Sequence, residues 1–161
     1  MDRLTQPLRD EHRALLPHVD EILAAADALG GQAAEDVVDR LKRVAAFLRH
    51  DLLRHASAEE AALYPVVRWA MDTYDATATM ARDHVEIARL SDRLSALVAD
   101  TRAGRPDLPA LRRVLYGLHA VVALHFAKEE EIYLPLLDER LTPDAAARMF
   151  AELEEAAEQA A

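Results

Sequence analysis

Two stretches of the chain repeat each other and decide its fold: HASAEEAALYP at residues 55–65 and HFAKEEEIYLP at residues 125–135. In both, a histidine is followed by glutamates four and five residues later and by a proline ten residues later. A shorter pair, RDEH at 9–12 and RDH at 82–84, precedes them in the same order. The pattern predicts two similar halves with a pseudo-twofold site between them.

Outside these stretches, Ala, Leu, Arg and Glu dominate, and all four favour helices. Apolar residues recur at helical spacing, and β-branched residues never alternate with polar ones for long enough to predict a strand. Breakers lie at Gly30–Gly31, Asp72–Asp75 and Gly104–Pro109. We therefore expect four long helices: from about Pro7 to Leu29, from about Ala34 to a kink or end at Pro65, from Met80 to Val98, and from Leu111 to a break at Pro135.

The connections between these helices are short, and short connections make neighbouring helices antiparallel. A fifth helix is expected from Pro143, with Thr142 as its N-cap. Its apolar residues Met149, Phe150 and Leu153 predict that it packs outside the others. The expected fold is all-α, an up-down-up-down four-helix bundle with an additional C-terminal helix. Residues 1–161 would form one domain, with the bundle at about 5–138 and the last helix at about 142–160.

Composition excludes several classes of function. A chain of 161 residues with 52% hydrophobic residues can bury a core without a disulfide or a metal. The absence of cysteine rules out thiolate zinc sites and iron–sulfur clusters, and four glycines cannot form a dinucleotide or phosphate loop. A net charge of -10 disfavours nucleic acid and anionic membranes as partners. With no secretory signal and no apolar run long enough to span a bilayer, we expect a cytoplasmic protein.

Four of the seven histidines fall on the core-facing stripes of the predicted helices, one on each helix. They are His12, His55, His84 and His125. Glutamates follow two of them by four residues, and at ~100° per residue this step leaves both side chains only ~40° apart on one helix face. His55 with Glu59, and His125 with Glu129, are therefore expected to reach a common centre.

Burying two carboxylates and four imidazoles in an apolar bundle costs several kcal/mol per ionised group unless a cation compensates them. Two metal ions would resolve this, with carboxylates bridging the ions and imidazoles capping them. Such mixed nitrogen and oxygen ligation suits iron or manganese. The predicted metal ligands are His12, His55, Glu59, His84, His125 and Glu129.

Other polar residues in or near these motifs are not among the predicted metal ligands. Glu60 and Glu130 lie ~140° from their histidines, so they either hydrogen-bond to ligands or remain solvated. Tyr64 and Tyr133 follow the glutamates by about one turn, and packing at a helix end is favoured over a place at the site. Three histidines lie off the stripes and are expected at the surface or its boundary: His18, His50 and His119.

The ordered motifs resemble those of the hemerythrin-like family, also called HHE cation-binding proteins. The resemblance covers about residues 5–138. It implies a four-helix bundle around two iron ions joined by an oxo or hydroxo bridge. The ligands of that centre would correspond to His12, His55, Glu59, His84, His125 and Glu129.

One departure from the family concerns its oxygen carriers, which have a fifth histidine one turn from the histidine of the third helix. The corresponding residues here are Met80 and Ala88. Either the iron is more open, or His18, His50, His119 or a tyrosine completes its shell. The resemblance implies binding of O2, peroxide or nitric oxide, with redox turnover as an extension.

Two alternatives stay open at this stage. One is a peroxidase-like, catalase-like or nitric-oxide-handling enzyme at the same centre. The other is a metal-free helical module that binds a partner through its acidic face. The sequence does not identify the redox partner.

Overall fold

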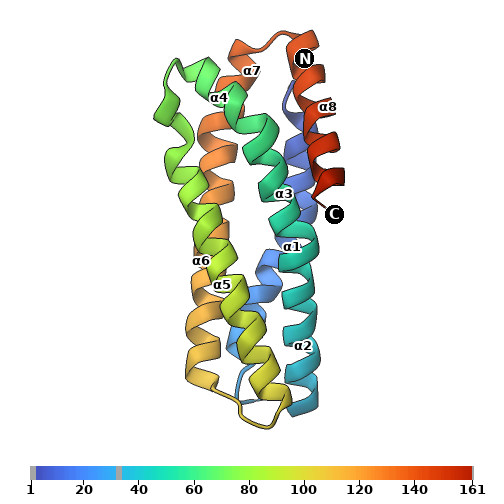
Figure 1. Ribbon diagram of the computed structural model, residues 1–161, viewed down its shortest axis with the longest axis vertical. Helices are drawn as coiled ribbons and strands as arrows, with labels where there is room; N and C mark the ends of the chain where they lie inside the picture. The colour runs from blue at the N-terminus through green and yellow to red at the C-terminus, as the bar shows by residue number, and fades with distance from the viewer. Residues whose placement is uncertain (1–2, 32–33, 161) are drawn as a thin grey trace.

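The structure is a computed structural model that describes residues 3–31 and 34–160. All regular secondary structure in these residues is helical, as predicted. Helix α1 (Gln6–Ala28) lies beside α2 (Ala34–Phe47) and α6 (Leu108–Lys128), and α5 (Ala78–Arg102) also lies beside α2 and α6. The long axes of these helices run in roughly the same direction and form an elongated bundle (Figure 1).

Two of the long helices contain π turns, which carry one residue more than an α turn. After α2 the chain continues without a break through η1 (Leu48–Leu52), α3 (Leu53–Ala58), η2 (Glu59–Leu63) and α4 (Tyr64–Met71). After α6 it continues through η4 (Glu129–Tyr133) into α7 (Leu134–Arg140). The elements η1, η2 and η4 are π turns, whereas η3 (Tyr74–Thr77) is a 3₁₀ turn that leads into α5.

Neither Pro65 nor Pro135 ends its helix, which corrects the predicted end at Pro65 and break at Pro135; the kink that was the alternative at Pro65 stays a prediction. Each proline lies in the first turn of an α-helix that directly follows a π turn. The backbone N–H groups of the residues just before the prolines, Tyr64 and Leu134, donate five residues back to the carbonyls of Glu59 and Glu129. Proline lacks an N–H and clashes with the carbonyl four residues back in an α-helix. Placed after a π turn, it is accommodated and the helix continues.

The π turns η2 and η4 also shift the buried stripe by one residue, which corrects part of the core that a regular α-helical repeat predicts. Continued past Glu129, the repeat predicts that Ile132 is buried, but Ile132 is 54% exposed, whereas its neighbour Tyr133 is buried. Continued past Glu59, it predicts Ala62 and Val66; Ala62 is buried, but Val66 is only partly buried and its neighbour Val67 is buried instead. The predicted stripe is therefore correct up to Glu59 and Glu129 and is displaced beyond Ala62 and Glu129.

The C-terminal helix α8 (Pro143–Gln159) begins as predicted. The Thr142 hydroxyl accepts a hydrogen bond from the Ala145 N–H at 3.3 Å, which satisfies one of the unpaired donors at the helix start. Helix α8 packs against α3 and η2 on one side of the bundle (Figure 1). Met149 is buried there, and Phe150 and Leu153 pack against the same apolar cluster.

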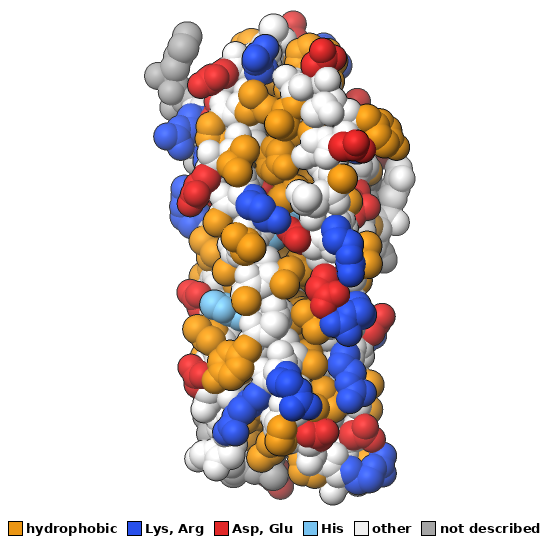
Figure 2. All heavy atoms as spheres, turned by 90° about the vertical axis from the view of Figure 1, so that its left-hand side faces the viewer, with side chains coloured by type: hydrophobic (Ala, Val, Ile, Leu, Met, Phe, Trp, Pro, Cys, Tyr) orange, Lys and Arg blue, Asp and Glu red, His pale blue; other side chains and the backbone are white. Residues whose placement is uncertain are grey.

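Two apolar clusters divide the core. One contains α1 residues that follow His12, such as Val19 and Ile22, and the other contains Leu8, which precedes it. The four stripe histidines therefore lie between the clusters. On the outside, acidic and basic side chains are interspersed over the face shown in Figure 2, and histidine is scarcely visible there. None of the helices within the described ranges is long and apolar enough to cross a membrane.

Candidate metal centre

The six predicted ligands come together in the middle of the bundle. Each histidine is supplied by a different helix, in the order α1, α3, α5 and α6, and the two glutamates begin the π turns η2 and η4. All six side chains are buried, with at most 5% of their surface exposed. Because helices from both halves contribute, the centre joins the two copies of the sequence repeat. These residues are His12, His55, Glu59, His84, His125 and Glu129.

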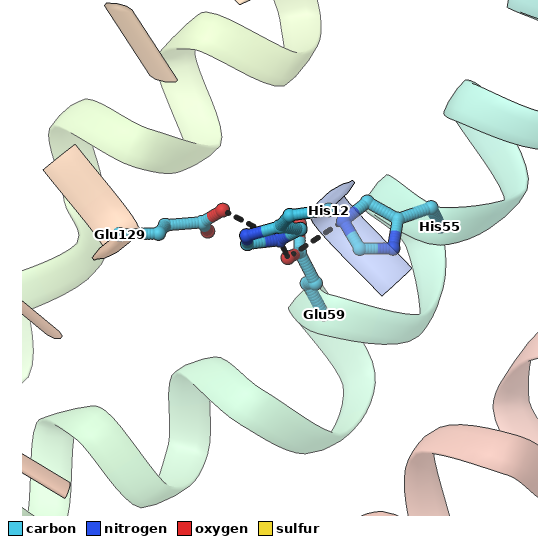
Figure 3. Close-up of side chains that lie close together, drawn as sticks. All are labelled: His12, His55, Glu59 and Glu129. Carbon is cyan, nitrogen blue, oxygen red and sulfur yellow. Dashed lines mark ion pairs between the residues drawn. The ribbon is translucent and has the colours of Figure 1, made fainter. Parts of the chain in front are cut away.

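The side chains form two overlapping groups whose ligand atoms lie within 4.8 Å of one another. In the first group, His12 Nε2 lies 3.6 Å from Glu59 Oε1 and 3.5 Å from Glu129 Oε2. His55 Nε2 lies 3.0 Å from the same Glu59 oxygen. Figure 3 shows these four side chains pointing toward one another, His55 and Glu59 from one continuous helix and His12 and Glu129 from two others.

The second group uses the other oxygen of Glu59. Glu59 Oε2 lies 3.4 Å from His84 Nε2 and 3.8 Å from His125 Nε2. In addition, Glu129 Oε1 lies 3.4 Å from His125 Nε2, while its Oε2 faces His12. Both carboxylates therefore reach across the two groups, as bridging ligands do.

Most of the converging atoms have no hydrogen-bond partner. Within the described part of the chain, both oxygens of Glu59, both oxygens of Glu129, and Nε2 of His12 and His55 are buried without one. Even at 3.0 Å, His55 Nε2 and Glu59 Oε1 do not have the angles of a hydrogen bond. A buried polar atom left unsatisfied costs about 1–3 kcal/mol, and more for a charged group. The nitrogen and oxygen donors fit a pair of divalent or trivalent cations, which would satisfy all of them together.

The opposite ring nitrogen of every histidine in the centre contacts a carboxylate. The partner of Nδ1 is Glu130 for His12, Glu11 for His55 and Glu60 for His84, each at 2.9 Å. For His125 the partner is Asp83, at 3.2 Å. A carboxylate accepting the Nδ1–H leaves the Nε2 lone pair free for a metal, and this arrangement is usual behind metal-bound histidines.

These carboxylates follow the sequence repeat. Glu11 and Asp83 each precede the first histidine of one half and contact the second histidine of that half. Glu60 and Glu130 each follow the glutamate of one half and contact the first histidine of the other half. Of the two roles left open for Glu60 and Glu130, the structure shows hydrogen bonding to the site histidines. Sequence reasoning missed Glu11 and Asp83, although an acidic residue before the histidine in both RDEH and RDH was a usable signal.

Tyr64 lies at the centre, contrary to the expectation of helix-end packing. It is 2% exposed, and its hydroxyl lies 3.2 Å from His84 Nε2. The π turn explains this position. In an α-helix residue 64 would be rotated ~140° from Glu59. With hydrogen bonds to the fifth residue back, one turn after Glu59 ends at Tyr64.

The other residues that the sequence offered for completing the coordination shell of the iron lie away from the centre. The Tyr133 hydroxyl donates to the carbonyl of Ala76 at 2.8 Å, which is the helix-end packing expected for it. His18 and His50 are exposed, and His119 is half-buried, as predicted. Neither of the two groups of converging side chains contains any of these three histidines. Met80, one of the two residues that lie one turn from His84, is fully buried.

Electrostatics at the centre favour a positive charge. Burial raises the pKa of the Glu59 carboxyl, but the surrounding imidazoles of His55, His12 and His125 outweigh it, so this pKa lies well below its ordinary range. Burial and the negative charge of Glu59 raise the pKa of Glu129. Burial lowers the pKa of His125, but contact with Glu129 and Glu59 raises it to about 10. The metal-free centre therefore holds protons where a cation would neutralise the carboxylates.

The fold and this site define a helical-bundle protein with a candidate centre for cations. The chain matches the family described as "Hemerythrin HHE cation binding domain" over residues 3–137, and again over residues 75–161. It therefore belongs to the hemerythrin HHE cation-binding family. The second match begins 72 residues after the first, the interval that also separates His12 from His84, in keeping with the internal repeat. Comparison with curated proteins and with solved structures gave no match.

Proposed function

We propose that this chain is a non-heme di-iron protein that binds O2, or a related small ligand such as peroxide or nitric oxide, in the bundle core. The observation that carries the proposal is the set of six buried side chains whose donor atoms converge, six of these atoms having no hydrogen-bond partner among the described residues. Membership of a cation-binding family supports a metal, and the hard oxygen and imidazole donors support iron. The proposal includes an up-down-up-down order for the long helices and a location in the cytoplasm.

The two groups of donors divide the six ligands between two ions. His12 and His55 would hold one ion, and His84 and His125 the other, because they fall in separate groups. Glu59 belongs to both groups, and the oxygens of Glu129 face His12 and His125. Both carboxylates would thus bridge the pair. When bound, two irons joined by an oxo or hydroxo bridge supply reversible electron transfer and an open position for a small ligand.

The surrounding residues hold the ligands in place and exclude water. Four carboxylates fix the orientation of the imidazole rings through Nδ1. The Phe126 ring stacks on His12 with centroids 4.5 Å apart and planes at 13°. Apolar side chains above and below the centre complete its enclosure. A ligand that enters would therefore meet a preorganised, largely dry site.

Iron content tests the proposal directly. Protein produced with iron should contain two irons per chain and show the near-ultraviolet and visible absorption of a bridged ferric pair. Replacing His55 or Glu129 with alanine should abolish stoichiometric loading. The matched control is His119→Ala, which removes a half-buried histidine of α6 that lies outside both donor groups. Less than one iron per wild-type chain, with no such absorption, would contradict the proposal.

A second candidate function, peroxide or nitric oxide turnover, is favoured by an asymmetry at the centre. Tyr64 in the first half aligns with Leu134 in the second, and Met80 aligns with Leu8. The Tyr64 hydroxyl contacts His84 Nε2, whereas its counterpart Leu134 is buried and apolar, as are Met80 and Leu8. A hydroxyl beside an open metal position can donate a hydrogen bond to bound peroxide, which would assist turnover.

Steady-state assays separate this enzyme from a binding protein. Iron-loaded protein should consume peroxide faster than an equal concentration of free iron, with and without a reductant or nitrite. Tyr64→Phe should lower that rate, and Tyr133→Phe, whose hydroxyl binds the Ala76 carbonyl instead, should not. Turnover no faster than that of free iron would leave a binding function.

The alternative of a metal-free interaction module makes different predictions. It requires six buried donor atoms to remain unsatisfied in the working protein, at a cost in stability. Alanine variants of the ligands would then fold at least as well as the wild type, and chelators would leave its melting temperature unchanged. A substantial fall in melting temperature on iron removal would argue against the module.

A further inference from the structure

The four carboxylates behind the site histidines differ in one respect: among the residues that the structure describes, two are paired with the side chain of an arginine or a lysine and two are not. Glu130 forms an ion pair with Arg9, and Asp83 forms one with Lys128. Glu11 and Glu60 are about half exposed and face solvent instead. Each donor group contains one histidine whose carboxylate is paired with a cation: His12 in the first group and His125 in the second.

The two cations are additions to the repeat rather than part of it. Arg9 aligns with Ala81 of the other half, and Lys128 aligns with Ala58. Each cation thus occupies a position where its counterpart has only a methyl group. The repeat alone would make the Glu130–His12 contact equivalent to Glu60–His84, and the Asp83–His125 contact equivalent to Glu11–His55. The two cations make one member of each equivalent pair different.

Arg9 is fixed from both sides. It is 8% exposed, and its Nη1 donates to the side chain of Glu130 and, at 3.3 Å, to the backbone carbonyl of that residue. Its Nη2 lies 3.4 Å from Asp138 Oδ2, and Asp138 in turn accepts hydrogen bonds from the backbone and hydroxyl of Thr5. A chain of contacts therefore runs from the start of α1 through Arg9 and Glu130 to His12.

Lys128 acts on a single oxygen atom. Its Nζ and His125 Nδ1 both contact Asp83 Oδ2, so the cation competes with the imidazole for the same acceptor. The contact from Asp83 to His125, at 3.2 Å, is longer than the three other carboxylate–histidine contacts, at 2.9 Å. The cation thus draws the carboxylate away from the ring and weakens its hold on the Nδ1–H.

We infer that Arg9 and Lys128 are positioning residues that each reduce the electron donation of one histidine ligand per iron and so raise the reduction potential of the pair. This rests on the proposed function. A carboxylate that accepts strongly from Nδ1–H makes the imidazole a better donor and stabilises the ferric ion. A cation that shares the carboxylate reverses this effect. The two residues would therefore stabilise the reduced state, which takes up oxidising ligands.

The inference is tested by the midpoint potential of Lys128→Met, measured on iron-loaded protein by mediated titration. Without the lysine, the full negative charge of Asp83 acts on the iron, and a unit charge about 10 Å away at an effective dielectric constant near 20 changes the Fe(III)/Fe(II) ratio on the order of tenfold. The midpoint potential of the variant should therefore be about 59 mV lower than that of the wild type for a one-electron couple. Lys128→Arg should restore the wild-type value.

Two controls distinguish this role from general surface charge. Arg82→Met removes a charge beside Asp83, but the Arg82 guanidinium pairs with Glu86 and is 65% exposed, so less than a twofold change is expected. In an Asp83→Asn background, Lys128→Met should have a smaller effect, because the carboxylate that transmits it is gone.

The outcomes separate this inference from the proposed function. Wild-type protein that binds no iron would overturn both. Wild-type protein that loads two irons, combined with equal potentials for Lys128→Met and Arg82→Met, would overturn the inference and leave the proposed function standing. Equal effects of Lys128→Met with and without Asp83 would show that the lysine acts by its charge alone and would also overturn it.

Discussion

Replacing Glu60 with glutamine should weaken metal binding without weakening the fold. Glu60 Oε1 contacts His84 Nδ1 at 2.9 Å, and the side chain is 48% exposed. Glutamine keeps the shape and an acceptor oxygen but loses the charge. Hydrogen bonds to charged groups contribute about 1.5–3 kcal/mol, against about 0.5–1.5 kcal/mol for neutral ones. An imidazole carries more positive charge once it binds a metal, so this difference of about 1–1.5 kcal/mol falls mainly on metal binding. It corresponds to about a tenfold loss of affinity at the ion that His84 would hold.

The assay is anaerobic titration of metal-free protein with Fe(II) against a competing chelator, with unfolding of the metal-free protein measured in parallel. Glu131→Gln is the matched control, since Glu131 is an exposed glutamate of a π turn at the same centre. We expect Glu60→Gln to bind one of the two ions about tenfold more weakly and to change the free energy of unfolding by less than about 0.5 kcal/mol. Equal affinities for the two variants would refute the orienting role of the carboxylate.

Four further predictions concern protons, the tyrosine, a distant helix cap and the ligand set. Because the pKa of His125 is raised to about 10, this imidazole is protonated at pH 7 in the metal-free protein and must release its proton to bind metal. Metal affinity should therefore rise with pH up to about 10, and calorimetry in buffers of different ionisation enthalpy should detect proton release; no release would contradict this. Without metal, the His125 charge stabilises the fold fully below about pH 6.5, and this contribution should disappear as the pH rises through about 10. Tyr64→Phe should leave iron content unchanged but alter azide affinity of the ferric protein, measured by absorption, while equal affinities for Tyr64→Phe and Tyr133→Phe would count against a hydroxyl at the ligand position. Asp107→Ala removes the side chain that accepts from the Ala110 N–H at 2.9 Å, so thermal unfolding should occur about 2–4 °C lower, with iron content intact; a loss of iron would show that the centre depends on this distant cap. Glu59→Ala should reduce loading of both ions, since Glu59 belongs to both donor groups, and metal analysis showing loss of only one ion would contradict its bridging place.

The α-helical repeat was sufficient to find the six candidate ligands, and it failed one turn later. From His55 to Glu59 the chain is helical with four-residue spacing, so the two side chains share a face as predicted. The π turn that begins at Glu59 adds a residue and rotates everything beyond it. Tyr64 therefore faces His84, and Val67 is buried instead of Val66. A proline follows η2 and another follows η4, but none marks η1, and nothing in the residues showed that the chain would adopt a π turn instead of ending the helix.

Contacts between helices were the second limit. Glu11 lies about 100° from His12 on its own helix, so the pattern within α1 gives no reason to place it at the centre. Its carboxylate reaches His55 on the neighbouring helix, and Asp83 reaches His125 in the same way. Which histidine such a residue contacts depends on how the helices pack against one another. The pattern of apolar residues within a single helix does not show this.

The proposed function requires that the six buried side chains hold two iron ions. A crystal structure of iron-loaded protein, with diffraction measured on both sides of the iron absorption edge, tests it most directly. We predict two anomalous peaks in the bundle core, each marking an iron ion. One ion would be bound by His12 and His55 and the other by His84 and His125, with Glu59 and Glu129 bridging them. A single peak, or iron bound outside these six residues, would contradict it.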